Sequence, residues 1–283
     1  MKKRFIYLMF GLVFLCTNLC LTLGNDSFQV ISDVAYKKQG KTDYEKERCK
    51  LDLYLPSGQK DFATLLWFHG GSLEKGDKAG DIAALGAKRL AGDGIAVVPV
   101  NYRLSPKVNY PAYIDDAAAS FAWVYKNIKK HGGDPKNVFI SGHSAGGYLV
   151  AMLAMDPRYL KKYGLELDAI AGVIPVSGQM ITHATVRKER GVSGTTPIID
   201  EAAPSYHARK DTPPFLAIFG SNDLPARAAE NMYFTAAMKA AGHKEIKHLE
   251  VEGRNHGTIA NKLPEKDDRV ALAITAFVKK YRR

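Results

Sequence analysis

The chain has 283 residues, of which 46% are hydrophobic and 24% are charged. This composition excludes an intrinsically disordered chain and suits one α/β domain with a large core. The formal net charge is +11, but lysines and arginines do not form runs with interleaved aromatic residues, so the sequence does not favour nucleic-acid binding.

The first 24 residues have the pattern of a secretory signal peptide. Three basic residues at positions 2–4 precede an apolar run, and Thr22 and Gly24 supply the small residues that precede a cleavage site. We place the cleavage near Gly24. A retained membrane anchor is the alternative interpretation of the same segment.

Removal of this leader has three consequences for the remaining chain, residues 25–283. The formal net charge falls from +11 to +8, because the leader carries three basic residues and no acidic one. Cys49 becomes the single cysteine, so no internal disulfide can form. We expect a periplasmic or secreted protein with no stable membrane insertion.

Strand and helix patterns alternate along the rest of the chain. Two segments with alternating polarity, 28–37 and 49–56, predict an antiparallel pair at the edge of a sheet. Apolar runs predict further strands, several of them buried, at 63–71, 95–103, 137–144, 169–178, 214–223 and 246–253. Helical periodicity predicts helices at 81–94, 113–133, 145–155 and 268–283.

This alternation predicts an α/β fold in which helices cover both faces of a mostly parallel sheet. Residues 179–214 interrupt the pattern with scattered Gly, Thr, Pro and Ser. A long connection inside a compact domain is often a lid or a binding loop. We expect this segment to be a lid-like insertion, with an apolar wall from Met180, Ile181, Val192, Ile198 and Tyr206. A disordered surface excursion is the alternative.

The stretch Gly142-His-Ser-Ala-Gly146 matches the G-x-S-x-G pattern and falls between a predicted strand and a predicted helix. That context is typical of a nucleophile elbow, in which the serine sits on a strained turn. Ser144 is therefore the candidate nucleophile, and the two glycines would let the strand and the helix approach each other. A small turn with no catalytic role is the alternative.

A serine hydroxyl needs a base to remove its proton, and the chain has eight histidines. His256 lies in a loop after the last predicted strand, which is the position of the base in the order nucleophile, acid, base. Asp223 follows the buried strand before it and is the candidate acid that orients the imidazole. Asp200, Glu201 and Asp211 are weaker candidates because they lie in the irregular segment.

The sequence Trp67-Phe-His-Gly-Gly-Ser72 follows the third predicted strand. Backbone N–H groups at such a position can stabilise a substrate oxyanion. We assign the oxyanion hole to the N–H groups of Gly70, Gly71 and Ala145, and we expect a structural role for His69. Ser72 departs from the more usual third glycine.

In chain order, the sequence contains the motifs HGGS, GDK, NYRLSP, YPAYIDDA, GHSAGG, GSND and NHG. This set of motifs resembles that of α/β-hydrolase carboxylesterases, in particular hormone-sensitive-lipase-like esterases and bacterial feruloyl and acetyl-xylan esterases. The resemblance covers nearly all of the chain after the leader. It implies an α/β-hydrolase fold and a serine esterase that needs no metal or organic cofactor.

The resemblance specifies the superfamily much better than it specifies the substrate. The expected substrate is a small-molecule or polysaccharide-linked ester, such as an acetyl or feruloyl ester of a plant polysaccharide. Two alternatives stay open. One is an amidase or peptidase of the same fold, similar to kynurenine formamidases or prolyl oligopeptidases, and the other is a non-catalytic binding module.

Overall fold

The computed structural model describes residues 28–37 and 40–283, and in this part of the chain eight strands form one sheet. The strand order is β1-β2-β4-β3-β5-β6-β7-β8. The pairs β1–β2 and β2–β4 are antiparallel, and all the other neighbours are parallel. The antiparallel pair lies at one edge, as the alternating pattern of its residues predicted.

The strands are β1 (Phe28–Ala35), β2 (Lys50–Pro56), β3 (Phe62–Phe68), β4 (Ala96–Val100), β5 (Gly133–His143), β6 (Gly172–Val176), β7 (Phe215–Asn222) and β8 (Ile246–Asn255). The α-helices are α1 (Asp43–Arg48), α2 (Asp81–Gly92), α3 (Ala112–Asn127), α4 (Ala145–Met155), α5 (Pro157–Lys161), α6 (Ala184–Glu189), α7 (Arg227–Ala240), α8 (Thr258–Asn261) and α9 (Arg269–Tyr281). Short 3-10 helices are η1 (Ile128–His131), η2 (Leu167–Ala169) and η3 (Pro204–His207).

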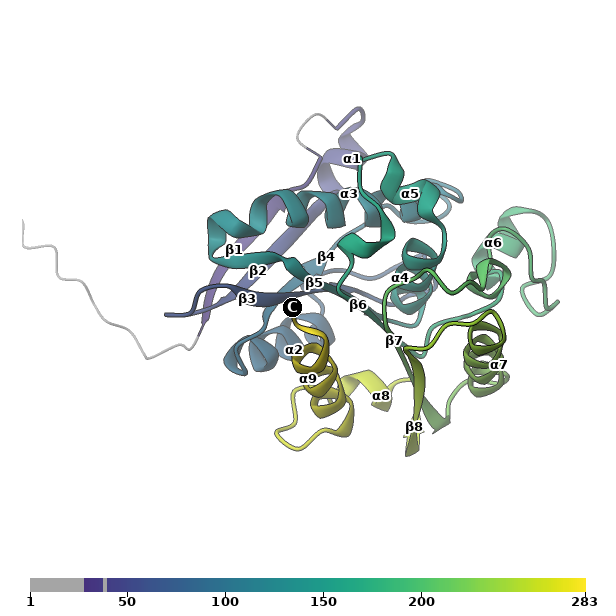
Figure 1. Ribbon diagram of the computed structural model, residues 1–283. Helices are drawn as coiled ribbons and strands as arrows, with labels where there is room; N and C mark the ends of the chain where they lie inside the picture. The colour runs from purple at the N-terminus through teal and green to yellow at the C-terminus, as the bar shows by residue number, and fades with distance from the viewer. Residues whose placement is uncertain (1–27, 38–39) are drawn as a thin grey trace, which may run out of the picture.

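Helices cover both faces of the sheet (Figure 1). Helices α3 and α4 pack on one face, and α2 and α9 pack on the other. Strand β3 shows why both faces need cover: its side chains alternate between the two faces of the sheet, and all of them are buried. Leu66 and Phe68 join the core under α3 and α4, whereas Leu65 and Trp67 join the core under α2 and α9.

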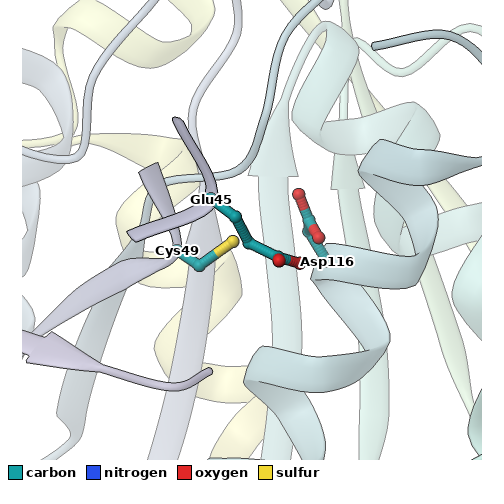
Figure 2. A group of neighbouring side chains, drawn as sticks. All are labelled: Glu45, Cys49 and Asp116. Atoms are coloured by element: carbon teal, nitrogen blue, oxygen red, sulfur yellow. The ribbon is translucent and has the colours of Figure 1, made fainter. Parts of the chain in front are cut away.

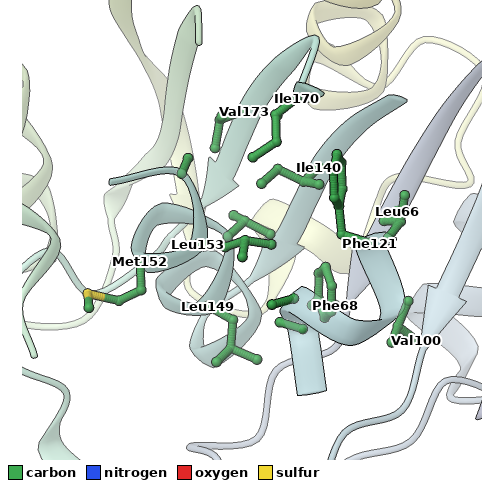
Figure 3. Close-up of a cluster of buried hydrophobic side chains, with 14 of the residues drawn as sticks. Leu66, Phe68, Val100, Phe121, Ile140, Leu149, Met152, Leu153, Ile170 and Val173 are labelled. Atoms are coloured by element: carbon green, nitrogen blue, oxygen red, sulfur yellow. The ribbon is translucent and has the colours of Figure 1, made fainter. Parts of the chain in front are cut away.

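Helix α4, which begins directly after the nucleophile candidate Ser144, is part of the core on this face of the sheet. All eleven residues of α4 are buried. Its leucines contact a cluster that includes Phe121 of α3 and Ile140 of β5 (Figure 3). A helix that is buried all round cannot move without opening this core, so the residue that precedes it is held in a fixed place.

The sequence-based elements are largely confirmed, with differences at connections. Helix α1 occupies the connection between β1 and β2, which is therefore longer than a tight hairpin. Helix α7 was not predicted. The segment 179–214 contains α6 and η3 and so is not a disordered excursion. The helix expected at 113–133 ends earlier and continues as η1, which is capped by the next residue, Gly132, with φ 90°.

The leader predicted at residues 1–24 lies outside the described residues. Over 28–37 and 40–283, none of the helices combines the length and apolar character that a membrane crossing requires.

Candidate active site

The stretch around Ser144 forms a tight turn between β5 and α4. Ser144 has φ 56° and ψ −114°, a conformation that residues other than glycine rarely adopt. A Cβ atom at Gly146 would lie 2.0 Å from the carbonyl oxygen of Phe68. One at Gly142 would lie 2.7 Å from the carbonyl carbon of Gly146. Both glycines therefore permit the close approach of β5 and α4 that the sequence pattern predicted, and they also leave room for the end of β3.

The structure brings the three predicted triad residues into one hydrogen-bonded chain. His256 Nε2 lies 2.8 Å from Ser144 Oγ, and His256 Nδ1 lies 2.7 Å from Asp223 Oδ1. Asp223 follows β7 and His256 follows β8, so both come from the carboxyl ends of neighbouring parallel strands. The weaker carboxylate candidates lie elsewhere: Asp200, for example, accepts hydrogen bonds from Thr182 and Arg190.

The environment of Asp223 keeps its carboxyl group ionised. Burial alone would raise the pKa of Asp223, but hydrogen bonds from His256, Ser177 and the Leu224 backbone lower it to about 2. Ser177 Oγ donates to Asp223 Oδ2 at 2.5 Å, and Leu224 N donates to Asp223 Oδ1 at 2.7 Å. An ionised carboxylate in this position holds the imidazole with Nδ1 protonated, which leaves Nε2 free to accept the serine proton.

The three predicted oxyanion-hole residues lie on two segments beside the nucleophile. A Cβ at Gly70 would lie 3.3 Å from Ser144 Cβ, so the loop after β3 passes directly beside the elbow. Gly71 has φ 108°, and a Cβ there would lie 2.1 Å from the Lys75 carbonyl oxygen, which only glycine tolerates. Ala145 is the first residue of α4 and is fully buried. The N–H groups at a helix start are unpaired within the helix and carry a partial positive charge.

The insertion 179–214 is hydrogen-bonded to the loop that follows β3, residues 69–76, which we call the glycine loop. Thr185 Oγ1 in α6 donates to the Ser72 carbonyl at 2.5 Å. Met180 cannot form part of the apolar wall expected around the substrate, because it is fully buried in the core under α3 and α4. Tyr206, in contrast, is 60% exposed. The expectation for Met180 is therefore wrong: this residue anchors the insertion to the core.

Glu45, Cys49 and Asp116 are a group that could in principle hold a metal ion, with ligand atoms within 4.8 Å of one another (Figure 2). Cations of the chain already pair with both carboxylates. Lys37 Nζ lies 2.8 Å from Glu45 and 2.5 Å from Asp116, and Arg103 binds Asp116 through two nitrogens. Burial raises the pKa of the Cys49 thiol to about 11. The group is therefore a structural ion-pair network that joins the NYR and YIDDA motifs.

Residues that contact the triad from neighbouring strands were not identified from the sequence. Ser177, directly after β6, donates a hydrogen bond to Asp223. His143, inside the elbow, donates from Nε2 to the His256 carbonyl at 2.8 Å. The position of Ser177 at the carboxyl end of a strand was a usable signal, but the strand order β6-β7 that makes it a neighbour of Asp223 cannot be deduced from periodicity.

Two family models match the chain. The model of the prolyl oligopeptidase family matches residues 114–282, more than half of the chain. The model described as BD-FAE matches residues 51–172. Together they cover every residue of the candidate site, since the first includes the triad and the second the glycine loop and elbow.

Curated relatives include esterases of Mycobacterium tuberculosis. Esterase LipC is 26% identical over 216 residues, which are 70% of this chain and 53% of the relative. The probable carboxylic ester hydrolase LipM is 25% identical over 79% of this chain and 55% of its own length. The chain thus spans about half the length of these curated relatives.

Similar folds occur among solved structures. A truncated carbohydrate esterase from gut microbiota superimposes with a TM-score of 0.75 at 20% identity, over 91% of this chain and 98% of that one. A hyperthermophilic esterase from Pyrobaculum calidifontis superimposes with a TM-score of 0.68 at 22% identity, over 90% of this chain and 85% of that one. The chain therefore has the α/β-hydrolase fold that its motifs predicted, and it belongs to the prolyl oligopeptidase family.

Proposed function

We propose that this protein is a serine carboxylesterase that works through an acyl-enzyme. One observation carries the proposal: Ser144, on a strained elbow, is joined to His256 and Asp223 by hydrogen bonds of 2.8 and 2.7 Å. This is the geometry that a nucleophile, a base and an orienting acid require. The relatives named as esterases support the reaction class.

The proposed reaction has two halves. Ser144 Oγ attacks the ester carbonyl carbon while His256 Nε2 takes its proton, and the N–H groups of Gly70, Gly71 and Ala145 stabilise the oxyanion. His256 then gives that proton to the leaving alcohol as the tetrahedral intermediate collapses to the acyl-enzyme. Water attacks the acyl-enzyme with His256 again as base, and the carboxylic acid leaves. No step requires a metal or an organic cofactor.

The proposed substrate is a small-molecule or polysaccharide-linked ester, with acetyl and feruloyl esters of plant polysaccharide as the first candidates. The resemblance of the sequence motifs to those of feruloyl and acetyl-xylan esterases and the similarity in fold to a carbohydrate esterase support this choice. The insertion 179–214 is proposed as a lid over the acyl group. We propose no nucleic-acid partner.

Export is part of the proposal and rests on the predicted leader at residues 1–24, which has the composition of a signal peptide. N-terminal sequencing of the protein released by a bacterial host tests it. The proposal expects a periplasmic or secreted protein that begins near Asn25, without stable membrane insertion. A protein that keeps Met1 and stays with the membrane fraction would support the retained anchor instead.

A panel of substrates tests the activity: p-nitrophenyl acetate, methyl ferulate, acetylated xylan and an acyl p-nitroanilide. Esterase activity predicts that kcat/KM for the acetate ester exceeds that for the anilide by several orders of magnitude. Turnover of the anilide at a comparable kcat/KM would favour an amidase or peptidase, the alternative that the prolyl oligopeptidase family model supports. Failure of a fluorophosphonate to label the protein would favour the non-catalytic binding module.

A further inference from the structure

Arg48, the last residue of α1, contacts the glycine loop, although it lies far from the triad residues in the sequence. The side chain is buried, with 9% of the residue exposed. Its Nε donates to the Tyr102 carbonyl at 3.1 Å, and its Nη2 donates to the Gly76 carbonyl at 3.0 Å. Nη1 pairs with Asp77 Oδ2 at 3.1 Å, which offsets the buried charge. Nη2 also lies 3.3 Å from His69 Nε2.

These contacts determine which nitrogen of His69 carries the proton. His69 Nδ1 lies 2.7 Å from the Gly70 carbonyl oxygen, which can only accept a hydrogen bond, so Nδ1 must be the donor. Arg48 can only donate, so His69 Nε2 must be the acceptor. Burial lowers the pKa of His69 to about 4, with a further contribution from the Arg48 charge, so the ring is neutral at pH 7.

The surroundings hold the His69 ring in one orientation. The ring stacks on Tyr102, with centroids 4.4 Å apart and 16° between the planes. Tyr102 Oη donates to the His69 carbonyl at 2.8 Å. A Cβ at Gly76 would lie 2.3 Å from His69 Nδ1, so the returning loop closes the third side.

The orientation of the Gly70 carbonyl determines the orientation of the Gly71 N–H in the proposed oxyanion hole. The Gly70–Gly71 peptide is trans and planar, so the Gly70 carbonyl and the Gly71 N–H point in opposite directions. A hydrogen bond that fixes the carbonyl on the His69 side therefore also fixes the direction of the Gly71 N–H. Loss of that bond would allow the peptide to rotate and would weaken a donor to the oxyanion.

We propose that Arg48 is a positioning residue for ester hydrolysis: it donates to His69 Nε2, selects the ring tautomer whose Nδ1–H holds the Gly70 carbonyl, and so directs the Gly71 N–H. The inference rests on the proposed function, because it assigns the Gly71 N–H to the oxyanion hole. It adds a residue from the connection between β1 and β2 to the groups on which the reaction depends.

The first experiment compares Arg48→Lys with Arg103→Lys, a matched control at a partly buried arginine that binds Asp116 and no part of the glycine loop. Lysine keeps the charge but cannot make the forked contacts of arginine. Removal of an oxyanion donor reduces kcat about 10²–10³-fold, so a misdirected donor should reduce kcat of Arg48→Lys roughly 10- to 100-fold. KM should stay within about twofold.

The affinity of a trifluoromethyl ketone, whose serine adduct carries an oxyanion, should fall in proportion to kcat/KM. Arg103→Lys should change kcat and ketone affinity less than about twofold, even if its melting temperature falls. An Arg48→Lys variant with unchanged kcat and ketone affinity would overturn the inference. So would a loss that appears in KM alone.

A double-mutant cycle tests the route through His69. Asparagine at position 69 supplies an amide donor near the place of Nδ1 and has no tautomer to select. Arg48→Lys should therefore have little further effect on kcat in the His69→Asn background. An equal fold-loss in both backgrounds would show that Arg48 acts by another route.

The tautomer itself can be measured in the wild-type protein, should Arg48→Lys fail to fold. Nitrogen NMR of histidine-labelled protein at pH 7 should show His69 with a proton on Nδ1 and none on Nε2. The opposite tautomer would overturn the inference. Ser144→Ala separates this result from the proposed function: if that variant keeps full activity, the proposed triad fails, whereas an inactive Ser144→Ala beside a normal Arg48→Lys rejects only the role of Arg48.

Discussion

His143 Nε2 donates a hydrogen bond to the backbone carbonyl of His256 at 2.8 Å, and the two rings lie 4.8 Å apart. A carbonyl oxygen only accepts, so the proton of His143 is on Nε2. Burial lowers the pKa of His143 to about 4, and the ring is neutral at pH 7. We therefore expect His143, the residue before the nucleophile, to hold the loop that carries the base and so to maintain the distance between Ser144 and His256.

Replacement of His143 by leucine should therefore reduce activity without removing any member of the triad. Loss of one buried hydrogen bond is worth about 1–2 kcal/mol, which corresponds to roughly a tenfold lower kcat with KM unchanged. Steady-state kinetics with p-nitrophenyl acetate measures this effect. His248→Leu, at an exposed position on β8, is the control and should keep kcat within about twofold. An unchanged kcat in His143→Leu would show that the loop keeps its position without this bond.

Asp223→Asn should keep the shape of the site and reverse its hydrogen bonding. An amide at this position can present its N–H to His256 Nδ1 and so favour the wrong tautomer, with a loss of about 10⁴ in kcat. Asp200→Asn removes a carboxylate that pairs with Arg190 instead, and its kcat should change little. A large loss in Asp200→Asn with a small one in Asp223→Asn would mean that another carboxylate orients the base.

Stability should decrease as the pH falls from about 6.5 towards 4. Burial lowers the pKa of His69 and His143 to about 4 and that of His183 to about 3, whereas histidines of the unfolded chain titrate near 6.5. In this window the unfolded state binds more protons than the native state, so the free energy of unfolding falls with decreasing pH. The lowered pKa of Asp223 acts at lower pH, because its contribution is lost only below about 4.

Urea denaturation at pH 7.5, 6.0 and 5.0 measures this slope. Each neutral buried histidine contributes on the order of 1 kcal/mol per unit of pH within the window. His183 accepts a hydrogen bond from Thr185 N at the start of α6, and asparagine can cap a helix in the same way. His183→Asn should therefore flatten the pH dependence. An equal slope in both proteins would contradict the assignment of His183 as a neutral buried ring.

Shortening the exposed tip of the insertion should alter substrate preference. Residues 195–197 lie beyond α6 and are all exposed, and they leave out Gly194, whose carbonyl accepts a hydrogen bond from Arg187. Replacing them by one glycine should therefore change thermal stability little. If the insertion is a lid, the ratio of kcat/KM for acetyl and feruloyl esters should shift well beyond twofold. A ratio that stays within about twofold, or roughly 0.4 kcal/mol, would place the tip outside the substrate site.

The features that the sequence predicted well are local. The elbow needs Gly142, Ser144 and Gly146 at fixed spacing between a strand and a helix, and all three can be read from consecutive residues. Asp223 and His256 follow apolar runs that mark strands, and parallel strands end at one edge of a sheet. These local patterns are therefore sufficient to identify the three triad residues.

Helix α7 shows why other parts were missed. Its buried face includes Asn231, Phe234, Thr235 and Met238, which have helical spacing. Two of these four are polar, so apolar periodicity alone does not reveal the helix. Asn231 is buried because its amide donates to the carbonyl of Gly178, a partner 53 residues away. Contacts of this kind depend on the assembled sheet, and the same holds for Arg48 with His69.

Mapping of a fluorophosphonate adduct on the purified protein tests the central claim most directly. Mass spectrometry of the labelled wild-type protein should locate the phosphonyl group on Ser144. Ser144→Ala should take up no label and should lose roughly 10⁶ in kcat for p-nitrophenyl acetate, because members of a triad act as a unit. A label on another residue, or near-normal ester turnover by a folded Ser144→Ala, would contradict the account.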